Sequence, residues 1–63
     1  MKNIIKNLRK AANFTQQELA DKLNVSRQTI IAIENDKYNP TLELAIKISK
    51  LFKTSVEDIF FLD

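Results

Sequence analysis

Residues 15–35 read TQQELADKLNVSRQTIIAIEN, and the predicted fold depends on the signals in this segment. It contains two apolar patterns of helical spacing, one over residues 16–23 and one over residues 27–35, separated by the short segment 24–26. A connection of three or four residues joins two helices at a steep angle. Such a crossing brings the backbones close together, and the small side chain of Ala20 fits at that point. The stretch therefore predicts a helix-turn-helix unit.

Polar residues mark where both helices begin. Thr15 and Glu18 have the T-x-x-E spacing of a capping box, in which each side chain bonds the backbone N–H of the other residue. Ser26 is a suitable N-cap for the second helix. The apolar residues expected to lock this unit to the rest of the protein are Leu19, Leu23, Val25, Ile30 and Ile33.

Three further helices are expected outside this unit. Apolar spacing predicts them over residues 3–12, 42–52 and 56–61, with Thr41 and Ser55 as N-caps of the last two. The residues expected on the apolar face of the helix over 42–52 are Leu42, Leu44, Ala45, Ile48, Leu51 and Phe52. No segment alternates with period two for long enough to predict a strand. The expected fold is all-α, a compact five-helix arrangement over residues 1–63 as a single domain.

The sequence contains no glycine, so its tight turns must use other residues. Glycine is the usual left-handed residue just past the end of a helix, and Asn and Asp are the next best. We therefore expect left-handed backbone at Asn13, Asn24 and Asp36. Lys53 would be a costlier occupant of a fourth such turn.

Composition excludes several classes of protein. The chain has no Cys and no His, which rules out disulfides and argues against a classical zinc site, so no metal or cofactor is expected. No run of about 18 apolar residues could span a membrane, and the N-terminus has no apolar stretch of signal-peptide length. A cytoplasmic location is the simplest interpretation. With no Gly-rich loop and no sheltered pair of carboxylates, nothing in the sequence indicates an enzyme.

The formal net charge is only +2, but its distribution is uneven. The first ten residues contain no acid, and their basic side chains are Lys2, Lys6, Arg9 and Lys10. A basic end of this kind is consistent with nucleic-acid binding. A solvated helix face would produce the same pattern, so charge alone does not decide the function.

The helix predicted over residues 27–35 carries a second face besides its apolar one. Ile30 and Ile33 define the buried side. The residues that fall together elsewhere are Arg27, Gln28, Ile31 and Ala32. Arg can bond guanine, Gln can bond adenine and an aliphatic group can contact a thymine methyl. Alternatively, Arg27 could clamp a phosphate or pair with an acid, Gln28 could be solvated, and Ile31 could pack in the core.

Other polar residues of the unit are candidates for phosphate contacts. They are Gln16, Gln17, Ser26, Thr29, Lys37, Tyr38 and Asn39. The two glutamines open a helix, where free backbone N–H groups and the positive end of the dipole suit a phosphate. The two hydroxyl residues can cap, pack or bond a phosphate. The last three could hold the DNA backbone or could simply form a turn, with the tyrosine on the edge of the core.

The C-terminal run of residues 59–62 has more apolar surface than one short helix can bury. Exposed apolar patches often mark interfaces. A two-fold dimer would place two recognition helices about 34 Å apart, which matches DNA half-sites one turn apart. We therefore expect a homodimer interface at Phe60, Phe61 and Leu62. The alternative is that the phenylalanines only close the core of the monomer.

Residues 15–48 resemble the Cro/CI-type (Xre-like) helix-turn-helix repressors, particularly their short stand-alone members, and the similarity extends from Ile4 to about Phe60. The most specific parts are the run SRQTI at 26–30 and the run KYNPTL at 37–42. The resemblance implies a lambda-repressor-like fold and a homodimer that binds double-stranded operator DNA and usually represses transcription.

By the same resemblance, the residues that read bases are Arg27, Gln28, Ile31 and Ala32. It also implies that the residues near phosphates include Gln16, Lys37, Tyr38 and Asn39. Several relatives carry a polar base-reading side chain where this chain has Ala32. Specificity is therefore expected to depend mainly on Arg27 and Gln28.

A protein-interaction module, such as an antitoxin-like domain, is the main alternative function. Such a module would not need the face that contains Arg27, Gln28 and Ile31. No small-molecule ligand is expected, because the sequence offers no obvious place for an inducer. Control is expected instead through concentration, dimerisation or an interacting protein.

Overall fold

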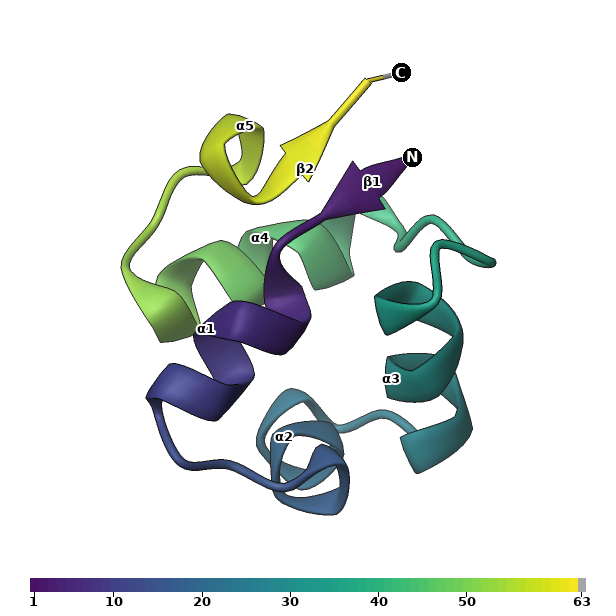
Figure 1. The fold of residues 1–63 in the computed structure, drawn as a ribbon, viewed down its shortest axis with the longest axis vertical. Coiled ribbons are helices and arrows are strands. Elements are labelled where there is room, and N and C mark those ends of the chain that lie inside the picture. Colours follow the sequence, from purple (N-terminus) through teal and green to yellow (C-terminus); the bar gives the residue numbers. More distant parts are fainter. Residues whose placement is uncertain (63) are drawn as a thin grey trace.

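The structure, a computed structural model, describes residues 1–62. Its elements in chain order are β1 (Lys2–Asn3), α1 (Ile5–Ala11), α2 (Gln16–Leu23), α3 (Arg27–Glu34), α4 (Leu42–Phe52), α5 (Val56–Ile59) and β2 (Phe60–Phe61). The five-helix fold predicted from the sequence is confirmed. The short strands and α5 lie at the end of the molecule away from α2 (Figure 1). None of these helices has the length and apolar character needed to cross a membrane.

The helix starts lie where the cap residues predict them. The Thr15 hydroxyl accepts a hydrogen bond from the backbone N of Glu18 at 3.0 Å, and the backbone N of Thr15 donates to Glu18 Oε1 at 2.8 Å. The Ser26 hydroxyl accepts from the backbone N of Thr29 at 3.2 Å. These bonds satisfy donors that the first turn of a helix leaves unpaired. The helix α3 ends at Glu34, one residue before the predicted end.

All four turns expected to be left-handed have a positive φ, at 62° for Asn13, 60° for Asn24, 59° for Asp36 and 53° for Lys53. The side chain of Lys53 has no special tolerance of this conformation. Two hydrogen bonds close the loop around it. The backbone N of Thr54 donates to the Ser49 carbonyl at 3.1 Å, and the Ser49 hydroxyl donates to the Thr54 carbonyl at 2.6 Å.

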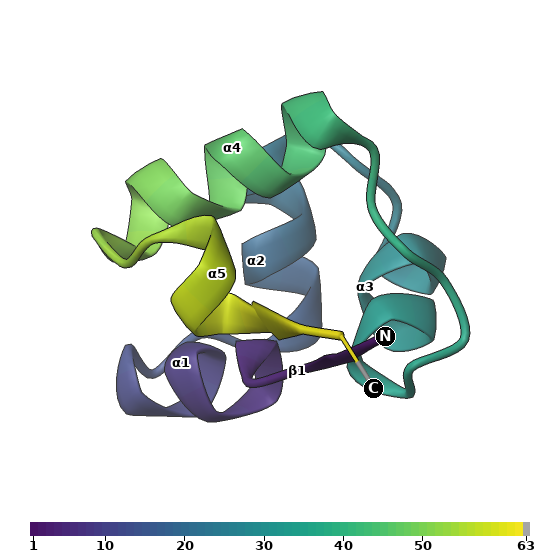
Figure 2. The ribbon, with the colours of Figure 1, turned by 90° about the horizontal axis from the view of Figure 1, so that it is seen from above.

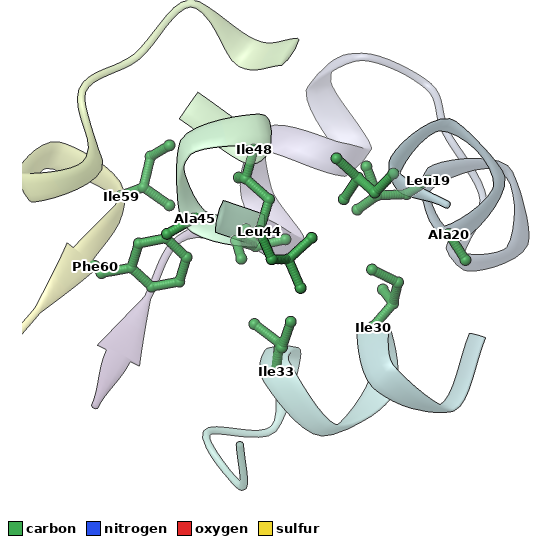
Figure 3. Close-up of a cluster of buried hydrophobic side chains, with 11 residues drawn as sticks. Leu19, Ala20, Ile30, Ile33, Leu44, Ala45, Ile48, Ile59 and Phe60 are labelled. Carbon is green, nitrogen blue, oxygen red and sulfur yellow. The ribbon is translucent and has the colours of Figure 1, made fainter. Parts of the chain in front are cut away.

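A single apolar cluster forms the core. Its buried members are Ile5, Leu19, Ala20, Leu23, Ile30, Ile33, Leu44, Ala45, Ile48, Ile59 and Phe60. Ile30 and Ile33 point from α3 towards Leu44 of α4 (Figure 3). Ala20 is fully buried, as expected for a small residue where α2 and α3 pack together. The predicted locking residues of the helix-turn-helix unit are therefore core residues, with Val25 partly buried against them.

The prediction that the chain contains no strand was wrong. Lys2 pairs with Phe61 and Asn3 with Phe60 in an antiparallel ladder. Strands of two residues are too short to produce an alternating pattern. The ladder also explains two corrected helix bounds: the helix predicted over 3–12 begins at Ile5, and the helix predicted to reach residue 61 ends at Ile59.

Leu42 also departs from its prediction, because its side chain is 74% exposed instead of packed. The core side of α4 is set by Leu44, Ala45 and Ile48. Leu42 precedes Leu44 by two positions, which rotates it about 200° around the helix axis. Ile46, one turn further on, lies on the same outer side and is also exposed.

Candidate nucleic-acid interface

The helix α3 lies at the edge of the molecule in two perpendicular views (Figures 1 and 2). Ile30 and Ile33 anchor it from the inside. Arg27 and Gln28 are exposed at its N-terminal end, and Ile31 is half-buried like Ala32. Of the adjacent isoleucines, Ile30 is therefore the core residue. The outer face of α3 keeps the polar and apolar groups that can contact base edges.

The start of α2 lies next to Arg27. Together with Arg9 and Thr15, the residues Gln16, Gln17 and Arg27 line an open hollow on the surface. The first turn of a helix leaves backbone N–H groups without an intrahelical partner, and these face an anion at such a position. The structure thus brings together two predicted phosphate residues and one predicted base-reading residue. Arg27 is placed where either a base or a phosphate could be its partner.

Both glutamine side chains at the start of α2 are already oriented by acids. The Gln16 Nε2 atom donates to Glu34 Oε1 at 3.2 Å, which links α2 to the end of α3. The Gln17 Nε2 atom donates to Asp21 Oδ1 at 2.9 Å, within α2. An amide nitrogen has two hydrogens, so each glutamine keeps one donor for another partner.

A buried ion pair supports this end of the unit, and the sequence did not reveal it. The Arg9 Nε atom lies 2.6 Å from Glu34 Oε2, and the two side chains are only 10% and 3% exposed. The Arg9 Nη2 atom adds a bond of 3.3 Å to the other carboxylate oxygen, and Nη1 donates to the Phe14 carbonyl at 2.9 Å. Arg9 is therefore not part of the basic surface expected at the N-terminal end. The exposed basic side chains there are Lys2, Lys6 and Lys10.

One signal in the sequence could have indicated this pair. Arg9 is the only arginine among the basic residues of the first ten positions. Arginine is preferred over lysine in buried ion pairs, because its planar guanidinium bonds a carboxylate through two N–H groups. Its position one residue after Leu8, on a helix that packs on the core, is consistent with that role.

The segment after α3 is held by the N-terminal strand. The Asn3 Nδ2 atom donates to the Ile33 carbonyl at 2.9 Å and to Asp36 Oδ1 at 3.2 Å. The backbone N of Lys37 donates to the Ala32 carbonyl at 2.9 Å. These bonds fix the turn after α3. The exposed residues that follow are Lys37, Tyr38 and Asn39. The role of Asn3 was not predicted from the sequence.

The other candidate residues of the unit take part in local contacts. The hydroxyls of Ser26 and Thr29 lie 3.0 Å apart and bond each other at the start of α3. Thr29 and Tyr38 also line a second hollow beside α4. Tyr38 is 42% exposed. It therefore packs partly against the protein and keeps part of its surface open to solvent.

The C-terminal apolar run is divided between the core and the surface. Phe60 is only 7% exposed and packs in the core near Ala45 (Figure 3). Phe61 is 42% exposed and Leu62 is 90% exposed. Phe60 therefore closes the core of the monomer, which was the alternative to a role in the interface. The surface available to a partner is contributed by Phe61 and Leu62.

Two short helices joined by a left-handed turn, with an exposed polar face on the second, define a helix-turn-helix DNA-binding protein. The chain belongs to the helix-turn-helix family, whose sequence profile matches residues 5–59. It is a regulator of the Cro/CI (Xre-like) type, which acts in transcription by binding DNA and is not an enzyme.

Three relatives illustrate this membership. The chain is 60% identical to an uncharacterised helix-turn-helix-type transcriptional regulator of Methanocaldococcus jannaschii, over 95% of this chain and 91% of that protein. It is 50% identical to the immunity repressor protein of Bacillus phage phi105, over 60% of this chain and 26% of the repressor. It is 36% identical to the transcriptional activator BcrR of Enterococcus faecalis, over 87% of this chain and 27% of the activator.

Proposed function

We propose that this regulator acts in the cytoplasm as a single-domain homodimer that binds a palindromic operator and represses transcription. The observation that carries the proposal is the placement of Arg27 and Gln28, which are exposed at the start of a helix that Ile30 and Ile33 clamp to the core. A rigid helix with an exposed, chemically mixed face is suited to the major groove.

In this arrangement the outer face of α3 reads bases. Arg27 bonds guanine and Gln28 bonds adenine, each through two hydrogen bonds. Ile31 and Ala32 add apolar contacts, for which the thymine methyl is the natural partner. Both are half-buried, so they offer only part of their surface, and discrimination between bases depends mainly on the two polar residues.

Phosphates on either side of the groove hold the protein in register. At one end the contacts come from Gln16, Gln17 and the backbone N–H groups at the start of α2. At the other end they come from Lys37, Tyr38 and Asn39, on the turn that Asn3 fixes. Ser26 and Thr29 have a smaller part, because their hydroxyls already bond each other.

The size of the molecule supports the homodimer. Its longest dimension is 27 Å, whereas recognition helices in successive major grooves are about 34 Å apart. Two copies are therefore needed to read two half-sites on one face of the DNA. Phe61 and Leu62 supply exposed apolar surface at one end of the chain, where a second copy can cover it.

Repression is the simplest consequence of such binding. A dimer that covers its operator excludes other proteins from the same DNA, and the DNA contacts alone achieve this. Activation requires an additional surface that contacts the transcription machinery. The similarity of residues in this chain to an immunity repressor protein, with 50% identity over 38 residues, supports the same choice.

The experiment compares Arg27→Ala with Lys37→Ala on a duplex that the protein enriches from random DNA and on a scrambled duplex. Arg27→Ala should cost about 1–3 kcal/mol on the enriched duplex and relax the preference at one base pair. Lys37→Ala should weaken binding to both duplexes alike and reduce the slope of log affinity against log salt by about 0.9. Titrations at several salt concentrations measure both effects.

Equal losses on both duplexes for both variants would contradict the division into base-reading and phosphate-binding residues. An Arg27→Ala variant that binds the enriched duplex normally would remove the central contact of the proposal. A protein-interaction module would enrich no particular duplex, and Arg27→Ala would leave its binding to the protein partner unchanged.

A further inference from the structure

Glu34 is an acidic residue on the helix proposed to enter the major groove. Its carboxylate does not face outward, since the side chain is only 3% exposed. It accepts hydrogen bonds from three nitrogen atoms, Arg9 Nε at 2.6 Å, Arg9 Nη2 at 3.3 Å and Gln16 Nε2 at 3.2 Å. The arginine neutralises a charge that would otherwise repel DNA. One carboxylate thus connects α1, α2 and α3 directly beneath the start of α2.

We propose that Glu34 is a positioning residue for DNA binding, which fixes the Gln16 amide so that its remaining N–H meets a backbone phosphate. This inference rests on the proposed phosphate contact of Gln16. It adds that the contact depends on a carboxylate that itself never touches DNA.

The chemistry of the amide explains why an acceptor is needed. A glutamine amide has one nitrogen that only donates and one oxygen that only accepts, and the two ends have nearly the same shape. The Glu34 carboxylate can only accept, so it selects the orientation with Nε2 towards Glu34. The second N–H of that nitrogen is then available to a phosphate. In the flipped orientation the carbonyl oxygen would meet the phosphate and repel it.

The same ion pair also places the backbone of this site. Arg9 Nη1 holds the Phe14 carbonyl at 2.9 Å, and Phe14 directly precedes Thr15, the N-cap of α2. The loop before α2, the Gln16 side chain and the end of α3 are thus held by one buried cluster. It sets the separation between the proposed phosphate site and the base-reading face.

The test measures how much each phosphate contributes to binding. In the enriched duplex, phosphates are replaced one at a time by neutral methylphosphonates, and the affinity of each protein variant is measured for every duplex. The variants are Gln16→Ala and the double variant Arg9→Met with Glu34→Leu. The double variant removes the acceptor without leaving a buried charge unpaired, a change that proteins often tolerate. Circular dichroism verifies its fold, and Arg9→Gln with Glu34→Gln, which also leaves no buried charge unpaired, is a second variant if the first does not fold.

We expect the wild type to lose about tenfold in affinity at one phosphate near the start of α2, as for a hydrogen bond to a charged group. Gln16→Ala and the double variant should both reduce this sensitivity to the part that the backbone N–H groups of α2 contribute, and Arg9→Gln with Glu34→Gln should reduce it less. All variants should keep the sensitivity at the phosphate near Lys37. A purely structural role would instead weaken binding equally at every phosphate. The matched control, Glu43→Gln with Lys47→Gln, removes an exposed ion pair of α4 and should leave the profile unchanged.

Two results would overturn the proposal in distinguishable ways. If the double variant keeps the wild-type profile, or weakens binding uniformly, Glu34 does not position Gln16, and the phosphate contact itself still stands. If Gln16→Ala already keeps the wild-type profile, the proposed phosphate contact of Gln16 is wrong, and the positioning role is lost with it.

Discussion

Lys53 adopts a left-handed conformation that glycine would adopt at no steric cost, with φ at 53°. The residues at the three comparable turns, Asn13, Asn24 and Asp36, tolerate this conformation better than lysine does. The strain at Lys53 is offset by the hydrogen bonds between Ser49 and Thr54 that close the turn. At the residue scale, the turn at Lys53 is therefore the one of these four whose stability a substitution can raise.

Replacing Lys53 by glycine should stabilise the protein by about 0.5–1 kcal/mol, which is the relief of left-handed strain less the greater freedom of glycine in the unfolded chain. Thermal and urea denaturation measure the change. Asn24→Gly is the matched control and should have a smaller effect, because asparagine already tolerates the conformation. A loss of stability in Lys53→Gly would show that the left-handed backbone there is not strained.

At the scale of elements, the unit formed by α2 and α3 depends on close packing at Ala20. This side chain is fully buried, and Ile30 of α3 lies in the same core cluster. Packing at this point fixes the angle at which α3 is presented. A larger residue would have to push the helices apart or adopt an unfavourable rotamer.

Ala20→Leu should therefore destabilise the protein by about 1–3 kcal/mol and weaken DNA binding beyond the loss of folded protein. Denaturation and a DNA titration on the folded fraction measure the two effects. The matched control is Ala11→Leu, at an exposed position of α1, whose effect should stay within about 0.5 kcal/mol. Equal stability of the two variants would show that the contact between α2 and α3 can accommodate a larger side chain.

The same scale shows what could be predicted from the sequence. Caps and left-handed turns depend on neighbouring residues, so the roles of Thr15, Ser26 and Asn24 were predictable. The Arg9–Glu34 pair and the bonds from Asn3 to the end of α3 join residues distant in the chain. No local spacing encodes such pairs, and the two-residue strands are too short for a pattern. The outer face of α3 was predictable because Ile30 and Ile33 fix its inner face.

At the scale of the whole molecule, reading two half-sites requires a second copy of the chain. A molecule 27 Å long does not reach from one major groove to the next. The strands β1 and β2 lie at the end of the molecule away from α2 (Figure 1). The exposed Phe61 is the last residue of β2, and the exposed Leu62 follows it directly. A two-fold contact there would leave the recognition helices free to face the DNA.

Leu62→Glu should weaken this association, because it places two carboxylates at an apolar contact, while the monomer fold should persist since Leu62 is 90% exposed. Sedimentation velocity over a range of concentrations measures the association, and circular dichroism the fold. Ala11→Glu, at an exposed position of α1, is the matched control and should remain dimeric. An unchanged dimer in Leu62→Glu would place the interface elsewhere.

Two copies of α3 are proposed to read a symmetric DNA sequence. The decisive measurement is selection from a random pool of duplex DNA with the purified wild-type protein at physiological salt. We expect enrichment of a palindrome whose half-sites are centred about ten base pairs apart. Binding that is sequence-independent and abolished by salt, or no enrichment at all, would contradict it and direct the search towards a protein partner.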